Sequence, residues 1–202
     1  MNKLLKSQLI EDAKRFYDIE ITLEDMDTLI KEANIVKYNS GDILCEIGDE
    51  LKQTGFILDG IIKTSFITYE GKEIVRFFHT KYSMFFDESL LGFTESKYRC
   101  EVINDSTVLL FDTIKLKELI NNNKTCNQFY LKSLESGMRY KIYRENELMT
   151  KNATERYKQF VADFPELIDT VKQCDIATYL GIEPQSLSRI KKSLKNKHSN
   201  NT

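Results

Sequence analysis

The sequence predicts an α+β protein with an N-terminal antiparallel β-barrel, a long helix and a C-terminal pair of short helices. Five of the eight glycines lie between residues 41 and 71, where they separate short runs of β-branched and aromatic residues. Turn glycines between short strands are typical of a small antiparallel barrel or sandwich. Residues 125–149 contain no proline and one glycine, which favours a continuous helix. Near the C-terminus, Gly181 and Pro184 divide two short helical patterns.

These elements fall into three expected regions. Residues 1–112 are expected to form the barrel with helices before it, residues 113–151 a short helix and the long helix, and residues 152–202 a C-terminal domain. Thr22 is placed to cap a helix in the first region, and another helix is expected to start near Asn152 and to end before Pro165. The expected strands are residues 43–47, 56–58, 61–69, 74–78 and 102–111, with a hairpin turn at 69–72.

The composition is that of a globular protein. The chain has 202 residues, of which 41% are hydrophobic, and a formal net charge of −2. No run approaches the roughly 20 apolar residues of a membrane span, and the N-terminus does not resemble a signal peptide, so we expect a cytoplasmic protein. The four cysteines are scattered and form no CxxC pair, which favours reduced thiols over disulfides or an iron–sulfur cluster. No nucleophile–base pair or cluster of metal ligands stands out, so we predict no enzyme, metal or cofactor.

The long helix carries a narrow apolar stripe. Its spacing has partial coiled-coil character, which predicts the seam of a homodimer. The alternative is that the stripe packs on the chain's own barrel. The stripe consists of Leu131, Leu134, Met138 and Ile142.

The C-terminal segment has the layout of a helix-turn-helix. A first helix is expected at residues 173–180 and a second at 184–195, joined by a sharp turn at Gly181. The small Ala177 lies where the second helix must cross closely. The other expected core positions are Ile176, Leu180, Leu187 and Ile190.

The second of these helices carries a concentrated positive charge. Residues 185–197 contain five basic residues and no acid, in a chain that is otherwise acidic. Gln185, Ser186 and Arg189 share the outward face near the helix start, where a recognition helix reads bases. Lys191, Lys192 and Lys195 are expected to contact phosphates. The alternative interpretations are a solvated charged face or a hairpin that binds a protein.

In this order, the elements resemble the Crp/Fnr family of bacterial transcription regulators. The resemblance covers nearly the whole chain and implies a cyclic-nucleotide-binding-like jelly roll, a homodimer and a palindromic operator in double-stranded DNA, with RNA polymerase as a further partner. The motifs that carry it are Tyr38-Asn-Ser-Gly-Asp-Ile-Leu, Ile47-Gly-Asp, Gly55-Phe-Ile-Leu-Asp-Gly, Glu70-Gly-Lys-Glu and Asp175-Ile-Ala-Thr-Tyr-Leu-Gly-Ile-Glu-Pro-Gln-Ser-Leu-Ser-Arg-Ile.

The family's nucleotide pocket is only partly matched. Members that bind cyclic nucleotides carry Gly-Glu for the ribose and, about ten residues later, an Arg for the phosphate. Here Asp87 replaces the glycine, Glu88 matches the Glu, and Tyr98 occupies the Arg position, with Arg99 next to it. A negative Asp87 is unfavourable near a phosphate. We therefore expect an unknown small-molecule effector other than cyclic AMP. The alternative is a cyclic-nucleotide-responsive activator in which Glu88 and Arg99 bind the ligand.

Overall fold

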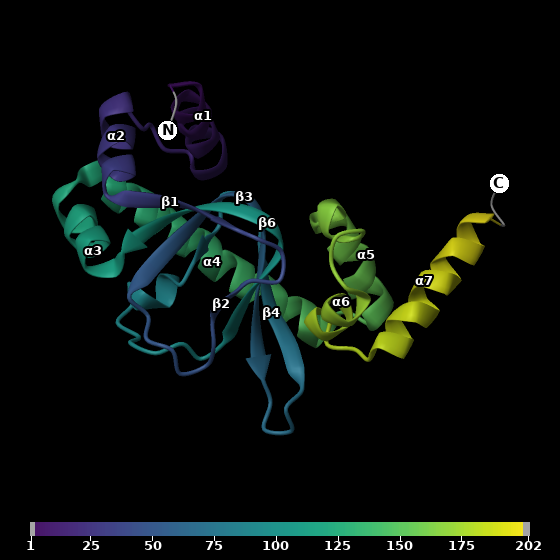
Figure 1. Ribbon diagram of the computed structural model, residues 1–202. Coiled ribbons are helices and arrows are strands. Elements are labelled where there is room, and N and C mark those ends of the chain that lie inside the picture. The colour runs from purple at the N-terminus through teal and green to yellow at the C-terminus, as the bar shows by residue number, and fades with distance from the viewer. Residues whose placement is uncertain (1–2, 200–202) are drawn as a thin grey trace.

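A computed structural model of the chain describes residues 3–199. Helices lie at both ends of the chain and the strands lie between them, in the order that the sequence predicts (Figure 1). The elements are α1 (Lys3–Tyr17), α2 (Leu23–Lys31), β1 (Ala33–Tyr38), β2 (Ile43–Cys45), β3 (Gln53–Ile67), β4 (Glu73–His79), β5 (Met84–Phe85), η1 (Asp87–Ser89), β6 (Arg99–Asp112), α3 (Thr113–Asn122), α4 (Lys124–Thr150), α5 (Ala153–Asp163), η2 (Pro165–Leu167), α6 (Gln173–Tyr179) and α7 (Pro184–Ser199). None of the helices in this described part is long and apolar enough to cross a membrane.

The six strands form one antiparallel sheet. Its order is β1-β6-β3-β4, with β2 paired to β6 and β5 paired to β3. The two runs predicted at 56–58 and 61–69 form one long strand, β3, whose register to β6 shifts between Ile57 and Ile62. Gly60 lies within this shift at φ +104°, and a Cβ there would come 2.1 Å from the Ser106 Oγ. Among residues 3–199 the pairing leaves the sheet open instead of closing the predicted barrel.

The helices begin and end at residues whose side chains satisfy the backbone. Thr22 caps α2 in a capping box with Asp25, as predicted. Asn123 caps α4, and Asn152 caps α5 in a second capping box with Glu155. The α5 helix ends at Asp163, because Phe164 precedes a proline and leaves the helical region.

Three apolar clusters hold the elements together. The first packs α1, α2, α3 and α4 against β3 and β6. The second lies within the sheet, around Ile57, Ile62, Phe85 and Val102, which are fully buried. The third joins β3 and β4 to the C-terminal helices α5, η2, α6 and α7. Figure 1 shows α1 and α2 on one side of the sheet and α5 to α7 on the other. The third cluster therefore attaches the C-terminal helices to the sheet through an apolar contact.

Candidate nucleic-acid interface and effector pocket

The C-terminal helices form a helix-turn-helix from α6 and α7. The turn is tight: the Gly181 N–H donates to the Thr178 carbonyl and the Ile182 N–H donates to the Ala177 carbonyl, each at 3.0 Å. Gly181 adopts φ +66°, a conformation that strains any side chain, and Pro184 is the first residue of α7. The structure buries Ile176, Ala177, Leu180 and Leu187 and leaves Ile190 half-buried.

The outward face of α7 is exposed and basic. Gln185, Arg189 and Lys192 are exposed, whereas Ser186 is half-buried at the flank of this face. Arg189 and Lys192 form no ion pair with an acid of residues 3–199. Figure 1 shows α7 projecting away from the remainder of the fold. This helix therefore presents positive charge to solvent.

A hollow of about 540 Å³ lies beside this face, along α7 and next to the start of α6. Sequence reasoning missed Ser188, which is exposed beside Lys191 and Lys192 and follows Gln185 at helical spacing. Lys191 donates to the Gln173 Oε1 at 2.8 Å, which ties the middle of α7 to the start of α6. The hollow is lined by Gln173, Pro184, Leu187, Ser188, Lys191, Lys192, Lys195 and Asn196.

The predicted stripe on α4 is left uncovered by the chain itself. Leu131, Met138 and Ile142 are 51%, 59% and 60% exposed, and Leu134 is half-buried. The opposite side of α4 contacts the rest of the protein, where the Arg144 guanidinium donates to the Tyr179 carbonyl at 2.6 Å. The alternative in which the stripe packs on the chain's own sheet is therefore wrong for these three side chains.

The effector pocket predicted around Glu88 is a closed polar cluster. The Glu88 Oε1 lies 2.7 Å from the Arg76 Nη1, and its Oε2 accepts a hydrogen bond from the Tyr98 hydroxyl at 2.6 Å. The Arg76 guanidinium also lies over the rings of Tyr98 and Phe66, at 5.1 and 5.8 Å from their centroids. Both carboxylate oxygens of Glu88 are thus engaged inside the protein.

The electrostatics of this cluster follow from burial. Burial alone would raise the pKa of Glu88, but the Tyr98 hydrogen bond and the Arg76 charge bring it below its ordinary value. Burial and the adjacent Glu88 carboxylate raise the pKa of Asp87 to about 6. Asp87 therefore stays negative at neutral pH, close to the position where a phosphate would have to bind.

The structure does not bring Arg99 to Glu88. Tyr98 and Cys100 are buried in the core within the sheet, so Arg99 between them points to the opposite face. There its Nε lies 3.4 Å from the Glu46 Oε1. This corrects the alternative in which Glu88 and Arg99 bind one ligand. The cation beside Glu88 is Arg76, which sequence reasoning missed. Its signal was a lone arginine in the apolar run of residues 74–78.

Comparison with known proteins shows a matching domain family and solved structures of similar fold. Residues 35–123 match the cyclic nucleotide-binding domain family, while no curated protein matches the sequence. FixK2 from Bradyrhizobium japonicum is similar at a TM-score of 0.72 and 17% identity, over 82% of this chain and 86% of that one. The c-di-GMP responsive regulator CLP of Xanthomonas campestris is similar at a TM-score of 0.72 and 10% identity, over 86% and 91%.

A third solved structure carries the family name. It is assigned to the Crp/Fnr family of transcriptional regulators, comes from Eubacterium rectale, and is similar at a TM-score of 0.69 and 12% identity, over 88% of this chain and 85% of that one. The chain therefore has the fold of the Crp/Fnr transcription regulators and contains a cyclic nucleotide-binding domain.

The residues present do not fit a cyclic nucleotide. The acceptor expected to hold the ribose, Glu88, is occupied by Arg76 and Tyr98. The position expected to hold the phosphate is the Tyr98 phenol, a weaker partner than a guanidinium, and Arg99 lies on the other face of the sheet. Glu88 and Arg99 therefore do not form one site in this structure.

Proposed function

We propose that the protein is a homodimeric, sequence-specific DNA-binding transcription regulator that works in the cytoplasm. The observation that carries this proposal is the outward face of α7, which is exposed, basic and free of acids between residues 185 and 196. A folded helix-turn-helix that presents such a helix suits the major groove of DNA, which is wide enough for one α-helix.

The roles of the side chains follow from their chemistry. Arg189 can donate two hydrogen bonds to a guanine, and Gln185 can pair with an adenine. Ser186, at the flank of the same face, is the third proposed base contact. Lys191, Lys192 and Lys195 are proposed to contact phosphates, which raises affinity for any sequence. Ser188 joins the set because the structure exposes it between Gln185 and Lys192.

The exposed stripe on α4 supports the dimer. Leu131, Met138 and Ile142 form an apolar ridge on a helix of 27 residues, which suits a second copy of the same helix. Two copies related by a two-fold axis would present two α7 helices. Such a dimer reads a palindrome with half-sites about one helical turn apart.

The effector is proposed to be a small molecule other than cyclic AMP, because Glu88 is engaged internally and Asp87 is negative. Titration calorimetry with cyclic AMP is expected to give no binding heat. Saturable binding that is lost in Arg76→Ala would show instead that this arginine leaves Glu88 to hold a phosphate.

Selection from a random DNA pool tests the DNA-binding proposal. The wild type is expected to enrich a palindrome. Arg189→Ala should weaken specific binding by roughly 1–3 kcal/mol and relax the preference at one position of each half-site. Lys192→Ala is the matched comparison, because it should weaken binding to all sequences alike and flatten the salt dependence.

Two outcomes would contradict the proposal. Arg15→Ala, on an exposed residue of α1, serves as the control and is expected to change neither property. If Arg189→Ala leaves discrimination between the palindrome and random DNA unchanged, Arg189 does not read bases. If the wild type enriches nothing and its binding to DNA shows no steep salt dependence, the C-terminal helices serve another partner, such as a protein.

A further inference from the structure

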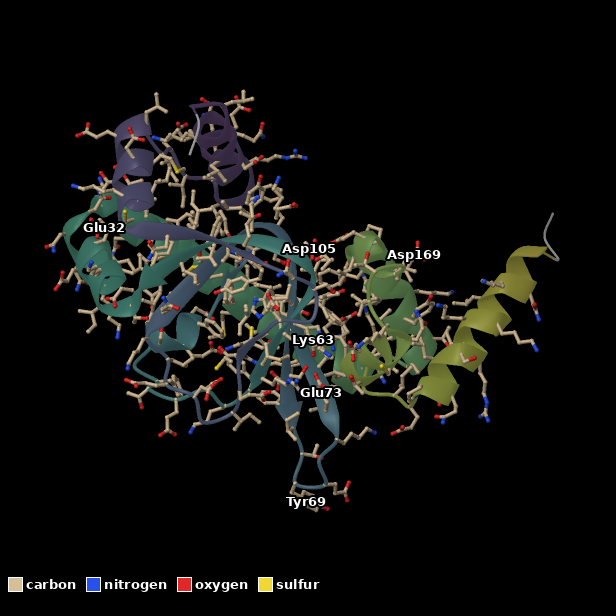
Figure 2. All side chains as sticks on the ribbon, in the orientation of Figure 1. Glu32, Lys63, Tyr69, Glu73, Asp105 and Asp169 are labelled. Carbon is tan, nitrogen blue, oxygen red and sulfur yellow. The ribbon has the colours of Figure 1, made fainter. Side chains whose placement is uncertain are left out.

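A buried lysine lies at the junction between the sheet and the helix-turn-helix. Lys63 is on β3 and is only 3% exposed. Its Nζ lies 3.0 Å from a Glu73 oxygen, 3.3 Å from a Glu101 oxygen and 3.1 Å from an Asp175 oxygen. Figure 2 shows Lys63 and Glu73 where the sheet meets α6. Two of the three carboxylates belong to the sheet and the third belongs to the first turn of α6.

This cluster is held together by charge. Burial alone would lower the pKa of Lys63 and raise that of Glu73, yet their ion pair moves both pKa values the opposite way. The lysine is thus charged and has three acids around it. Removal of one acid leaves the ammonium paired with the other two, whereas removal of the lysine would leave three carboxylates without their cation in a poorly solvated place.

Hydrogen bonds and a cation–π contact also hold α6 in place. The Val75 N–H on β4 donates to the Thr178 Oγ1 at 3.3 Å, one turn further along α6. At the end of α6, the Arg144 guanidinium of α4 lies 3.9 Å from the centroid of the Tyr179 ring. The Arg156 Nε of α5 donates to the Leu180 carbonyl at 3.0 Å. The sheet therefore holds one side of α6, while α4 and α5 hold its end.

We propose that Lys63 is a positioning residue for the DNA-reading helix. Its ion pair with Asp175 fixes the first turn of α6 to the sheet, and this contact is called the pin below. The position of α7 depends on that of α6, because Leu187 packs in the same buried cluster as Ile176, Ala177 and Leu180. That α7 reads DNA rests on the function proposed above, whereas the pin itself does not. Strand β4 connects this contact to the Glu88 cluster. Its Val75 N–H donates to Thr178 of α6, and the adjacent Arg76 forms the ion pair with Glu88.

Asp175→Asn is the first test. It removes the charge on the α6 side and leaves Lys63 with its two acids in the sheet, so the sheet should stay folded. Hydrogen exchange of the full-length protein without DNA is expected to show α6 amides exchanging at least about tenfold faster, with β6 amides unchanged. Asp169→Asn, an exposed acid among the same helices (Figure 2), is the matched control and should leave α6 protection unchanged.

Two further variants separate positioning from intrinsic helix stability. Asp175→Glu keeps the charge and is expected to retain most of the protection. Lys63→Met should raise exchange in α6 although the substitution lies on β3, an effect that a local helix-capping role of Asp175 would not produce. Lys72→Met, which breaks the exposed pair between Lys72 and Glu183, should have little effect. If Lys63→Met does not fold, Lys63→Gln takes its place, because it also removes the charge on β3 and leaves the start of α6 unchanged.

The DNA readout completes the test. With the operator selected for the wild type, Asp175→Asn is expected to lose at least about fivefold in affinity, because α7 is no longer held in place. Unchanged exchange in α6 of Asp175→Asn would overturn the pin, whatever the DNA result. A wild type that binds no DNA would overturn the proposed function, and the exchange measurements would still decide the pin.

Discussion

At the edge of the sheet, Arg76 of β4 and Glu88 of η1 form an ion pair of 2.7 Å, whereas on α7 Arg189 and Lys192 meet no acid among the described residues. Both regions are rich in polar side chains. Arg76 and Glu88 are half-buried beside Tyr98, whereas Arg189 and Lys192 on α7 face solvent. The Arg76–Glu88 pair is satisfied within the fold, while Arg189 and Lys192 remain available to a partner.

This difference separates charged groups that are paired inside the protein from charged groups that face solvent. Residues 35–123 match the cyclic nucleotide-binding domain family, and within this range Glu88 is paired with Arg76 and Tyr98. A buried ion pair adds little net stability but is costly to break. Substitutions in the sheet should therefore change the free energy of unfolding, while substitutions on the outward surfaces of α4 and α7 should change binding.

The largest expected effect is on the exposed face of α4. Ile142→Lys places a charge in the proposed seam and should weaken the dimer by about 3 kcal/mol or more, because an unpaired charge is costly to bury. Analytical ultracentrifugation measures the dissociation constant. Ile114→Lys, at a 70% exposed isoleucine of α3, is the control and should leave it unchanged. A variant that dimerises like the wild type would place the interface elsewhere.

The next effect concerns the committed charges of the sheet. Glu88→Ala leaves Arg76 and the Tyr98 hydroxyl without their acceptor, so we expect a loss of about 2–3 kcal/mol in urea unfolding. Glu95→Ala removes an exposed carboxylate, 3.5 Å from Lys97, and should cost below about 1 kcal/mol. Equal losses in the two variants would mean that the Glu88 cluster is no more committed to the fold than a surface pair.

A third effect, of similar or smaller size, is the pH dependence of the free energy of unfolding that His79 causes. His79 is 7% exposed, its Nδ1 donates to the Met84 carbonyl at 2.9 Å, and its Nε2 accepts from the Thr64 hydroxyl at 3.2 Å. Burial lowers the pKa of His79 to about 4 from an ordinary 6.5. Its stabilising contribution is therefore present above pH 6.5 and is lost as the pH falls toward 4, by up to roughly 3 kcal/mol.

The measurement compares His79→Gln with the wild type by urea unfolding at pH 7.5 and 4.5. The variant should be destabilised more at pH 7.5, by the amount that the wild-type histidine loses on acidification. The raised pKa of Asp87 works in the opposite direction between about pH 4 and 6, but it is common to both proteins and cancels. Thr64→Val, which keeps the imidazole, should retain the pH dependence. Identical differences at the two pH values would show that His79 titrates normally.

Local chemistry made much of the fold predictable. The helix start at Thr22, the hairpin at residues 69–72, the continuous α4 and the turn at Gly181 each depend on a few neighbouring residues whose backbone preferences agree. The errors in the strands also have a local cause. Gly60 was read as a turn, but in β3 it accommodates a register shift because Ser106 approaches too closely for a Cβ.

The candidate sites also divide into those set by local spacing and those set by contacts between distant residues. The sequence by itself determined the basic, acid-free α7 and the apolar stripe on α4, because helical spacing alone places those residues on one face. Only the tertiary structure decided that Arg76 pairs with Glu88, that Arg99 faces away from it and that Lys63 joins the sheet to α6. Lys63 and Asp175 are 112 residues apart. Such pairs depend on strand register and on the packing of distant elements, and a shift of one residue reverses the face on which a strand side chain lies.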